Sequence, residues 1–261
     1  MSCVQIDGRK ARIAPFSYIE QWIHRAMKEN PDVILLPEKW NCFSSPDTHF
    51  EQADENGDKT RTLLSRLAKT YGVNIVGGSI AEARKGKLYN TCHVFDRVGE
   101  EALVYDKVHL YQSGIERDYY AAGDRLGLVT LDGIPCGVAI CYDMDFPEWI
   151  RCYALQGVDI MFASFAWPSR WLGHMELVLR SRAIENQWYV AAAGICKSDR
   201  SGHMRSGGTA LVTPGGDLLA SAKSEEGVYT AIFQKSVLDA ARQWQHFLDD
   251  RRSDLYRRFG L

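Results

Sequence analysis

The chain has 261 residues and a formal net charge of −2, and its 31 basic and 33 acidic side chains are interspersed along it. This balance argues against nucleic acid or a membrane surface as the main partner. The length is sufficient for a large core, and no Pro/Ser/Gly-rich linker, low-complexity tract or repeat divides the sequence. We therefore expect a single domain over residues 1–261.

Cysteine usage and hydropathy predict a cytoplasmic protein. The seven cysteines are odd in number and show no C-x-x-C spacing, which argues against a disulfide framework or a zinc site. The N-terminus lacks a basic segment followed by a long apolar run, and no later stretch reaches the roughly 18 apolar residues of a membrane span. We expect that the protein needs neither a metal ion nor an organic cofactor.

In the first half of the chain, apolar periodicity predicts strands alternating with amphipathic helices. Gly77-Gly78 lies inside one expected strand, where glycines indicate a bulge or a close approach of another backbone segment. The last two strands of this half form an expected hairpin. The expected strands cover residues 3–6, 33–36, 73–80, 88–96 and 103–108, and the expected helices cover residues 16–27 and 57–71.

Three polar residues of this half stand at places where chemistry is often found. Glu38 follows an apolar strand and Pro37, and Lys107 lies near the end of another strand. Each would ordinarily be a solvated charge. Residues 109–125 read as an irregular loop of a length that is usually functional, and Glu116 is its most notable member.

Cys141 lies where the pattern changes from strand to helix. Residues 136–140 are small and apolar, as in a buried strand, and from Phe146 onward apolar residues recur at helical spacing. Backbone N–H groups in such a turn favour an anion, and the strand holds the thiol rigidly, which suits a nucleophile. The pattern fits a small buried hydrophobic residue equally well, so both interpretations stay open at this point.

The second half of the chain adds further strands and one helix. Because strands alternate with helices, we expect an α/β protein, and because some strands follow one another directly, its sheet is not purely parallel. The charged tail, residues 244–261, carries spaced aromatic residues and would wrap the core or a partner subunit. The expected strands cover residues 158–165, 188–193, 207–214 and 228–233, and the expected helix covers residues 175–187.

Glu38, Lys107 and Cys141 each lie at a strand end, where the functional sites of α/β sheets gather. A carboxylate, an ammonium and a thiol in one site suit acyl transfer. The carboxylate would take the thiol proton, and the thiolate would attack an acyl carbon. The ammonium and the N–H of Tyr142 would stabilise the oxyanion, and a second carboxylate would orient the base or the leaving amine.

Three segments resemble the catalytic motifs of the nitrilase superfamily of carbon–nitrogen hydrolases, in the order in which that family carries them. They are Leu-Pro-Glu-Lys-Trp at 36–40, Tyr-Asp-Lys-Val-His-Leu at 105–110 and Ile-Cys-Tyr-Asp-Met-Asp-Phe-Pro-Glu at 140–148. Supporting matches lie at 77–80, 89–91, 122–124 and 182–187, so the resemblance covers nearly the whole chain. The loop around Glu116 and residues 249–256 are similar to the ω-amidase branch, especially to bacterial amidases linked to methionine salvage.

The resemblance implies an α-β-β-α sandwich whose subunits pair into a homodimer. It places the family's catalytic Glu, Lys and Cys on Glu38, Lys107 and Cys141, and its second Glu on Glu116. The implied reaction is hydrolysis of a small amide to a carboxylate and ammonia through a thioester on Cys141.

The favoured substrate is the ω-amide of a 2-oxo dicarboxylate, such as 2-oxoglutaramate. In addition to Tyr142, we expect the aromatic, basic loop 167–171 to bind it. There Arg170 would hold a distal carboxylate in a bidentate pair, and Trp167 would form part of an aromatic wall along the carbon chain.

The sequence departs from the ω-amidase pattern at Asp145, where amidases of that branch commonly carry Arg. The exchange reverses a charge four residues after Cys141, and a second anion there would disfavour an anionic substrate. Two further departures look structural. They are Pro214-Gly215-Gly216 in place of the family's Pro-Trp-Gly, and the missing Asn after the first strand.

Other functions remain open. A nitrilase or an N-carbamoyl amidase would use the same Glu-Lys-Cys machinery. A papain-like hydrolase would pair a cysteine with His109 or His174, but neither histidine stands in a recognisable motif. A catalytically silent binding module of the same fold is the alternative that is not an enzyme, and it is disfavoured because all three catalytic residue types are present.

Overall fold

The computed structural model describes residues 1–42, 49–111, 115–198 and 204–260. In these ranges the strands form one hydrogen-bonded network whose two halves meet where Ile6 and Asp7 of β1 pair in parallel with Ile195 and Cys196 of β11. Parallel and antiparallel pairs both occur, as the sequence predicts. The N-terminal half contains β1 (Ser2–Asp7), β2 (Val33–Leu35), β3 (Asp54–Glu55), β4 (Asn74–Val76), β5 (Ile80–Arg84), β6 (Lys87–Phe95), β7 (Glu101–Asp106) and β15 (Gly227–Thr230).

The C-terminal half is built around three parallel strands, in which β10 pairs with both β9 and β11. Its strands are β8 (Gly127–Leu131), β9 (Ile134–Ile140), β10 (Ile160–Phe165), β11 (Tyr189–Ser198), β12 (Met204–Ser206), β13 (Ala210–Val212) and β14 (Leu218–Ser221).

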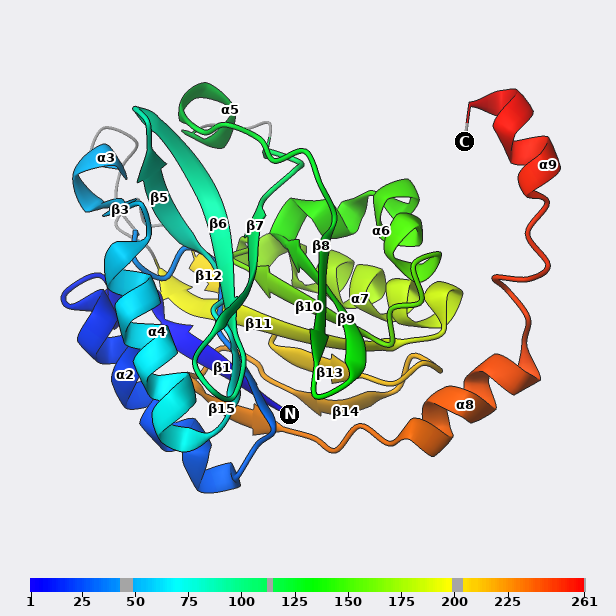
Figure 1. The fold of residues 1–261 in the computed structure, drawn as a ribbon, viewed down its shortest axis with the longest axis horizontal. Helices are drawn as coiled ribbons and strands as arrows, with labels where there is room; N and C mark the ends of the chain where they lie inside the picture. The colour runs from blue at the N-terminus through cyan, green and yellow to red at the C-terminus, as the bar shows by residue number, and fades with distance from the viewer. Residues whose placement is uncertain (43–48, 112–114, 199–203, 261) are drawn as a thin grey trace.

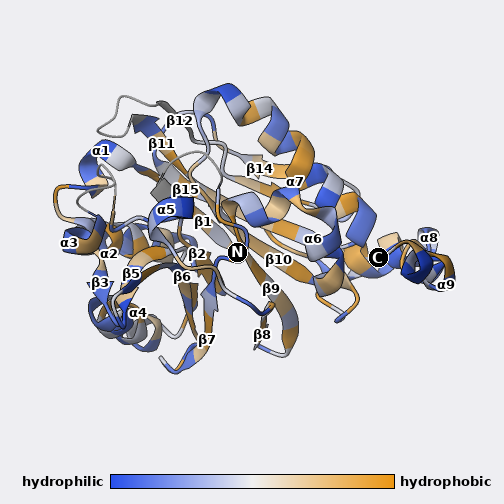
Figure 2. Ribbon diagram, turned by 90° about the horizontal axis from the view of Figure 1, so that it is seen from above, coloured by the Kyte–Doolittle hydropathy of each residue, from blue (hydrophilic) through white to orange (hydrophobic). Residues whose placement is uncertain are grey.

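Helices cover the outer face of each half (Figures 1 and 2). In Figure 2, α2 (Pro15–Ala26) and α4 (Asp58–Tyr71) lie on one side of the strands, and α6 (Pro147–Ala154) and α7 (Leu172–Asn186) lie on the other. The short helices are α1 (Gly8–Ala11), α3 (His49–Gln52) and α5 (Ile115–Tyr119). No helix in the described ranges has both the length and the apolar character that a membrane span requires.

Alternation along the strands explains the layers. On β1, Val4 and Ile6 pack with α2 and α4, whereas Cys3 joins a core formed by strands of both halves. On β10, Met161 packs with α6 and α7, whereas Phe162 belongs to the same central core. Because successive strand residues face opposite sides, strands that are apolar throughout must be covered on both faces. The predicted α-β-β-α sandwich is therefore confirmed.

The single strand predicted over 73–80 is wrong. β4 ends at Val76 and β5 begins at Ile80. Between them Gly78 has a φ of +65°, and a Cβ at this position would lie 2.1 Å from the carbonyl oxygen of Pro37. The predicted close backbone approach is thus present, but it ends one strand and redirects the chain into the next.

The C-terminal segment is tied to the body through its first helix, where Arg242 Nη1 donates to Asp159 Oδ1 (2.7 Å) and Leu238 is buried, and it extends outward beyond that helix (Figure 1). It contains α8 (Lys235–Trp244) and α9 (Ser253–Tyr256), neither of which the sequence pattern predicted. Trp244 and Phe259 are 85% and 82% exposed. Aromatic residues are enriched at protein–protein interfaces.

Candidate active site

The turn that carries Glu38 is fixed by the residues that follow β4. The Ser79 backbone N–H donates to the Pro37 carbonyl (3.0 Å), and the Lys39 N–H donates to Ser79 Oγ (3.0 Å). Together with the close approach of Gly78, these bonds hold Glu38 in place, only 2% exposed.

Lys107 joins Glu38 to Glu116. Its Nζ donates to Glu38 Oε1 (3.0 Å) and to Glu116 Oε2 (2.8 Å), and the residue is 1% exposed. Burial alone would lower the pKa of Lys107, but the carboxylates of Glu116 and Glu38 outweigh it and hold this pKa well above its ordinary value. Lys107 is therefore a permanent ammonium between two buried carboxylates.

Glu116 is the more heavily engaged of the two carboxylates. Besides Lys107, it pairs with Lys39 (3.0 Å) and accepts hydrogen bonds from Asn90 Nδ2 (2.9 Å) and the Tyr111 backbone N–H (3.0 Å). Burial would raise the pKa of Glu116, but Lys107 and Lys39 lower it below the ordinary value. Glu116 is therefore a weak proton acceptor.

Asn90 is a site residue that the sequence pattern alone does not single out. Its Nδ2 donates to Glu38 Oε1 (2.9 Å) as well as to Glu116 Oε1, so one side-chain amide binds both carboxylates. The signal was present, because residues 89–91 are among the segments that match the family, but the pattern gives no reason for the match.

Cys141 begins the 3₁₀ helix η3 (Cys141–Asp145), directly after β9. Its φ of +50° is unusual for a residue with a side chain, and such strain costs about 1–3 kcal/mol and is concentrated at functional sites. The residue as a whole is partly exposed.

The surroundings of Cys141 keep its thiol protonated. Burial, followed by the charge of Glu38, raises the pKa of Cys141 well above its ordinary value, whereas Lys107 and a backbone hydrogen bond from Ala166 act in the opposite direction. Glu38 and Lys107 are thus near enough to influence the thiol. A thiol in this state needs a base before it can attack.

Asp143 ties the Cys141 turn to the segment that carries Lys107. Fully buried, it accepts hydrogen bonds from the Ile140 N–H (3.0 Å), the Tyr105 hydroxyl (2.8 Å) and the His109 N–H (2.8 Å). Asp143 lies within one of the three motifs, but the sequence pattern assigns it no role. A buried acid within a motif was the available signal, because it must find donors.

Arg182 holds the other end of the turn. From α7, its Nε donates to the Met144 carbonyl (2.9 Å) and its Nη2 to the Asp145 carbonyl (3.3 Å). The last carbonyls of η3 are thereby satisfied by a mostly buried guanidinium.

The three predicted substrate-binding residues differ in their surroundings. Tyr142 is partly exposed and packs edge-on against Tyr111 and Phe146. Trp167 is buried after the end of β10. Arg170 is exposed, with its guanidinium 5.8 Å from the Trp171 ring. Their roles stay predictions.

Both histidines of the papain-like alternative have a carboxylate partner. His109 Nδ1 lies 2.9 Å from Asp143 Oδ1, and its ring stacks on Phe146. His174 Nε2 lies 2.8 Å from Asp145 Oδ1. Among the described contacts, neither imidazole is paired with the Cys141 thiol. Nor do the described residues contain a group of three or more His, Cys, Asp or Glu side chains that would hold a metal ion.

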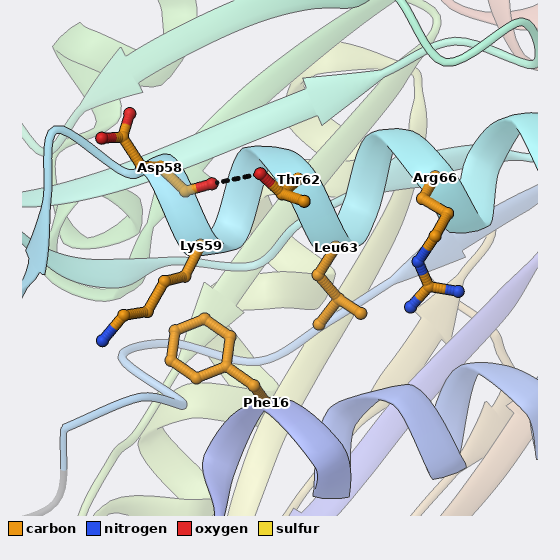
Figure 3. A pocket seen from close by; sticks show the side chains of 6 residues that line it. All are labelled: Phe16, Asp58, Lys59, Thr62, Leu63 and Arg66. Carbon is orange, nitrogen blue, oxygen red and sulfur yellow. Dashed lines mark hydrogen bonds between the residues drawn. The ribbon is translucent and has the colours of Figure 1, made fainter.

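A separate open hollow lies between α2 and α4 (Figure 3). Figure 3 shows the hydrogen bond from Thr62 Oγ1 to the Asp58 carbonyl inside α4 (2.8 Å). The predicted site residues do not line this hollow, so it is distinct from the Cys141 site. Its lining residues are Phe16, Asp58, Lys59, Thr62, Leu63 and Arg66.

A protonated thiol beside two carboxylates and a permanent ammonium can support attack on an acyl carbon and stabilise the resulting oxyanion. On an α-β-β-α sandwich, this arrangement is that of a hydrolase that works through a cysteine. The family model described as "Carbon-nitrogen hydrolase" matches residues 2–243. The chain belongs to the carbon–nitrogen hydrolase family, whose members act on carbon–nitrogen bonds other than peptide bonds.

Curated relatives agree with this assignment. The chain is similar to the 2-oxoglutaramate amidase of Bacillus subtilis (strain 168), with 34% identity over 256 residues and 98% of each chain covered. It is also similar to omega-amidase NIT2-A of Xenopus laevis, with 33% identity over 90% of this chain and 88% of the relative. The predicted family and its ω-amidase-like branch are thereby confirmed, and the alternative that is not an enzyme loses its support.

Solved structures share the fold. Saccharomyces cerevisiae Nit3, a member of branch 10 of the nitrilase superfamily, aligns with a TM-score of 0.84 and 28% identity, covering 97% of this chain and 96% of that one. A carbon-nitrogen hydrolase from Helicobacter pylori G27 aligns with a TM-score of 0.90 at 23% identity, covering 100% and 97%. At that identity the second likeness concerns the fold alone.

Proposed function

We propose that this protein hydrolyses the ω-amide of a 2-oxo dicarboxylate, such as 2-oxoglutaramate, to a carboxylate and ammonia. The observation that carries the chemistry is the buried Lys107 ammonium held between Glu38 and Glu116, beside the strained Cys141 turn. The substrate class is supported by the names of two relatives, the 2-oxoglutaramate amidase of Bacillus subtilis and the omega-amidase NIT2-A of Xenopus laevis.

Glu38 acts as the general base. Of the two carboxylates, Glu38 has fewer hydrogen-bond and ion-pair partners that compete for its oxygens. Glu116 is held by two ammonium groups, which lower its pKa. Burial raises the pKa of the Cys141 thiol and the charge of Glu38 raises it further, which supports Glu38 as the group that takes the thiol proton. Glu116 therefore serves to hold Lys107 and Asn90 in position.

The reaction then runs in two halves. Glu38 takes the thiol proton, the thiolate adds to the amide carbon, and the oxyanion is stabilised by Lys107 and by the Tyr142 N–H. The carbon–nitrogen bond breaks as Glu38 returns the proton to the leaving nitrogen, giving ammonia and a thioester. Glu38 then takes a proton from water, whose oxygen adds to the thioester carbon. The carbon–sulfur bond breaks, Glu38 returns the proton to the Cys141 sulfur, and the acid leaves the site as its carboxylate.

Substrate binding is assigned to Tyr142, Trp167 and Arg170 on the grounds given by the sequence. Trp167 follows Ala166, whose backbone hydrogen bond reaches the Cys141 thiol, which supports a place for Trp167 beside the acyl group. Arg170 would have to turn inward from its exposed position to reach a distal carboxylate.

The test is ammonia release from a panel that contains 2-oxoglutaramate, the matching ω-nitrile and an N-carbamoyl compound of similar length. We expect the amide to have the highest kcat/KM, and alkylation of Cys141 to abolish turnover. Faster turnover of the nitrile or of the carbamoyl compound would replace the amidase assignment by the corresponding rival. No ammonia from any of the three would refute the proposed function.

We also propose a homodimer of single-domain subunits, residues 1–261, that works in the cytoplasm without a cofactor. The dimer is supported by the extended segment 244–261 and by its exposed aromatic residues, Trp244 and Phe259. Light scattering tests the dimer directly. A monomer at micromolar concentration would remove that part of the proposal.

A further inference from the structure

Asp145 and His174 form a pair beside the Cys141 turn that the proposed chemistry does not use. His174 Nε2 lies 2.8 Å from Asp145 Oδ1, and the side chains are 49% and 20% exposed. Asp145 is the last residue of η3, which begins at Cys141, and His174 comes from α7, which packs against η3.

Two indoles hold the imidazole of His174 in place. Its ring stacks on Trp167, with centroids 5.3 Å apart and planes inclined by 28°, and it meets the edge of Trp171 at 5.8 Å. Trp167 follows Ala166, whose backbone hydrogen bond reaches the Cys141 thiol. The pair therefore stands on the same side of the sheet as the reacting sulfur, at the carboxyl ends of β9 and β10.

The pairing with His174 changes how Asp145 affects the binding of an anionic substrate. A lone carboxylate here would repel an anionic acyl group and attract an amine. Because His174 already occupies this carboxylate, Asp145 is matched by a group that becomes cationic on protonation. The second ring nitrogen of His174 then becomes a donor that is available to a ligand.

Elsewhere in the fold, the same chain shows how an imidazole bridges two carboxylates. His93 Nδ1 lies 2.8 Å from Glu101 Oε1, and its Nε2 lies 2.8 Å from Glu82 Oε2. His174 has one such carboxylate, Asp145, on its Nε2 and an exposed ring beside the candidate site. A carboxylate on the substrate would complete the same arrangement.

We propose that His174, oriented by Asp145 and stacked on Trp167, is a specificity-determining residue that binds the distal carboxylate of the acyl substrate. This inference rests on the proposed amidase function and adds a contact to it. It also removes the difficulty that Asp145 raises for an anionic substrate, because the carboxylate of Asp145 is already paired with His174.

The experiment compares succinamate with 4-oxopentanamide, a neutral amide with the same number of heavy atoms, in which a methyl group replaces one carboxylate oxygen. Ammonia release gives kcat/KM for each substrate, and the ratio of the two measures the preference for the anion. In His174→Gln we expect this ratio to fall about tenfold, or about 1.4 kcal/mol, while kcat/KM for the neutral amide stays within about twofold of wild type.

A matched control is His24→Gln. The side chain of His24, on α2, is 47% exposed and lies 3.8 Å from Glu20, so it resembles His174 in exposure and in having an acidic neighbour. Its replacement should leave the ratio unchanged. His174→Arg, which keeps a cation opposite Asp145, should retain most of the preference for the anion, whereas a purely structural role for His174 predicts no such rescue.

A ratio in His174→Gln within about twofold of wild type would overturn the inference, and so would a preference that is lost in Arg170→Gln alone. If His174→Gln does not fold, His174→Asn gives the same comparison. Ammonia from the neutral amide without any preference for succinamate in the wild type refutes the inference and leaves an amidase. Ammonia from neither amide refutes the proposed function itself.

Discussion

Replacing Lys107 by Met should lower the free energy of unfolding of the protein as well as inactivate it. Lys107 and Lys39 together balance the charges of Glu38 and Glu116, so the cluster of two ammonium groups and two carboxylates is neutral. Lys107→Met leaves this buried cluster with one uncompensated negative charge. Removing one partner of a buried ion pair typically costs about 3–5 kcal/mol.

Protonation of one carboxylate sets an upper bound on the unfolding free energy that Lys107→Met loses. The variant can bind a proton on one carboxylate instead of burying an unpaired charge. Because an ordinary Glu has a pKa of about 4.3, keeping it protonated at pH 7 costs about 3.7 kcal/mol, at about 1.36 kcal/mol per pH unit. We therefore expect the free energy of unfolding of Lys107→Met to be lower than that of wild type by about 3–3.7 kcal/mol at neutral pH.

The sign of the pH dependence follows from the same argument. The free energy needed to protonate a carboxylate decreases as the pH falls. The difference in unfolding free energy between wild type and Lys107→Met should therefore shrink to about 1 kcal/mol near pH 5. In the wild type the pKa of Glu116 is lowered. Its contribution to stability is therefore present above the ordinary Glu pKa and is lost only as the pH falls through the folded-state value.

Urea unfolding followed by circular dichroism, at neutral pH and near pH 5, measures both quantities. Lys10→Met is the control, because Lys10 forms a surface pair with Glu226 and such pairs contribute about 1 kcal/mol or less. The double variant Lys107→Met/Glu116→Gln should regain stability without regaining activity. A Lys107→Met protein within about 1 kcal/mol of wild type at neutral pH would contradict the buried-charge argument.

The remaining predictions concern the thiol, the base, the metal and a second buried network. Cys141→Ala should abolish ammonia release and leave the circular dichroism spectrum unchanged, whereas Cys152→Ala, on the exposed side of α6, should keep most of the activity. Glu38→Gln should lower kcat by about 10²-fold or more, and near wild-type turnover would show that another group is the base. EDTA should leave turnover unchanged, and a loss restored by a divalent ion would disprove the proposal that no cofactor is needed. Burial would lower the pKa of His93, but Glu101 and Glu82 raise it above its ordinary value, so His93 stabilises the fold below about pH 6.5 and this contribution is lost as the pH rises through the folded-state value. His93→Gln should remove that step from the plot of unfolding free energy against pH.

The sequence by itself determined the elements whose physics is local. The helix predicted over residues 57–71 is α4 (Asp58–Tyr71), because its apolar residues repeat at the helical period and Gly72 ends it in a left-handed conformation. The strand before Glu38 and the change from strand to helix at Cys141 were equally readable, because strand period, helix period and turn chemistry act between near neighbours. The three motifs in order then gave the family and its fold.

Only the tertiary structure decided how those elements meet. Asn90 bonds to Glu38 across 52 residues, and Lys107 bonds to the same carboxylate across 69, distances over which no periodicity carries information. The glycine that splits the strand predicted over 73–80 does so because the Pro37 carbonyl passes beside it.

Asp145 gives the clearest case of this division. In the sequence it is an unexplained reversal of charge near the nucleophile. In the fold it is the partner of His174, which lies on a different helix and reaches it only because α7 packs against the Cys141 turn. The local sequence pattern shows where a charged residue lies along the chain. Which charged residue it pairs with depends on packing between segments that are distant in sequence.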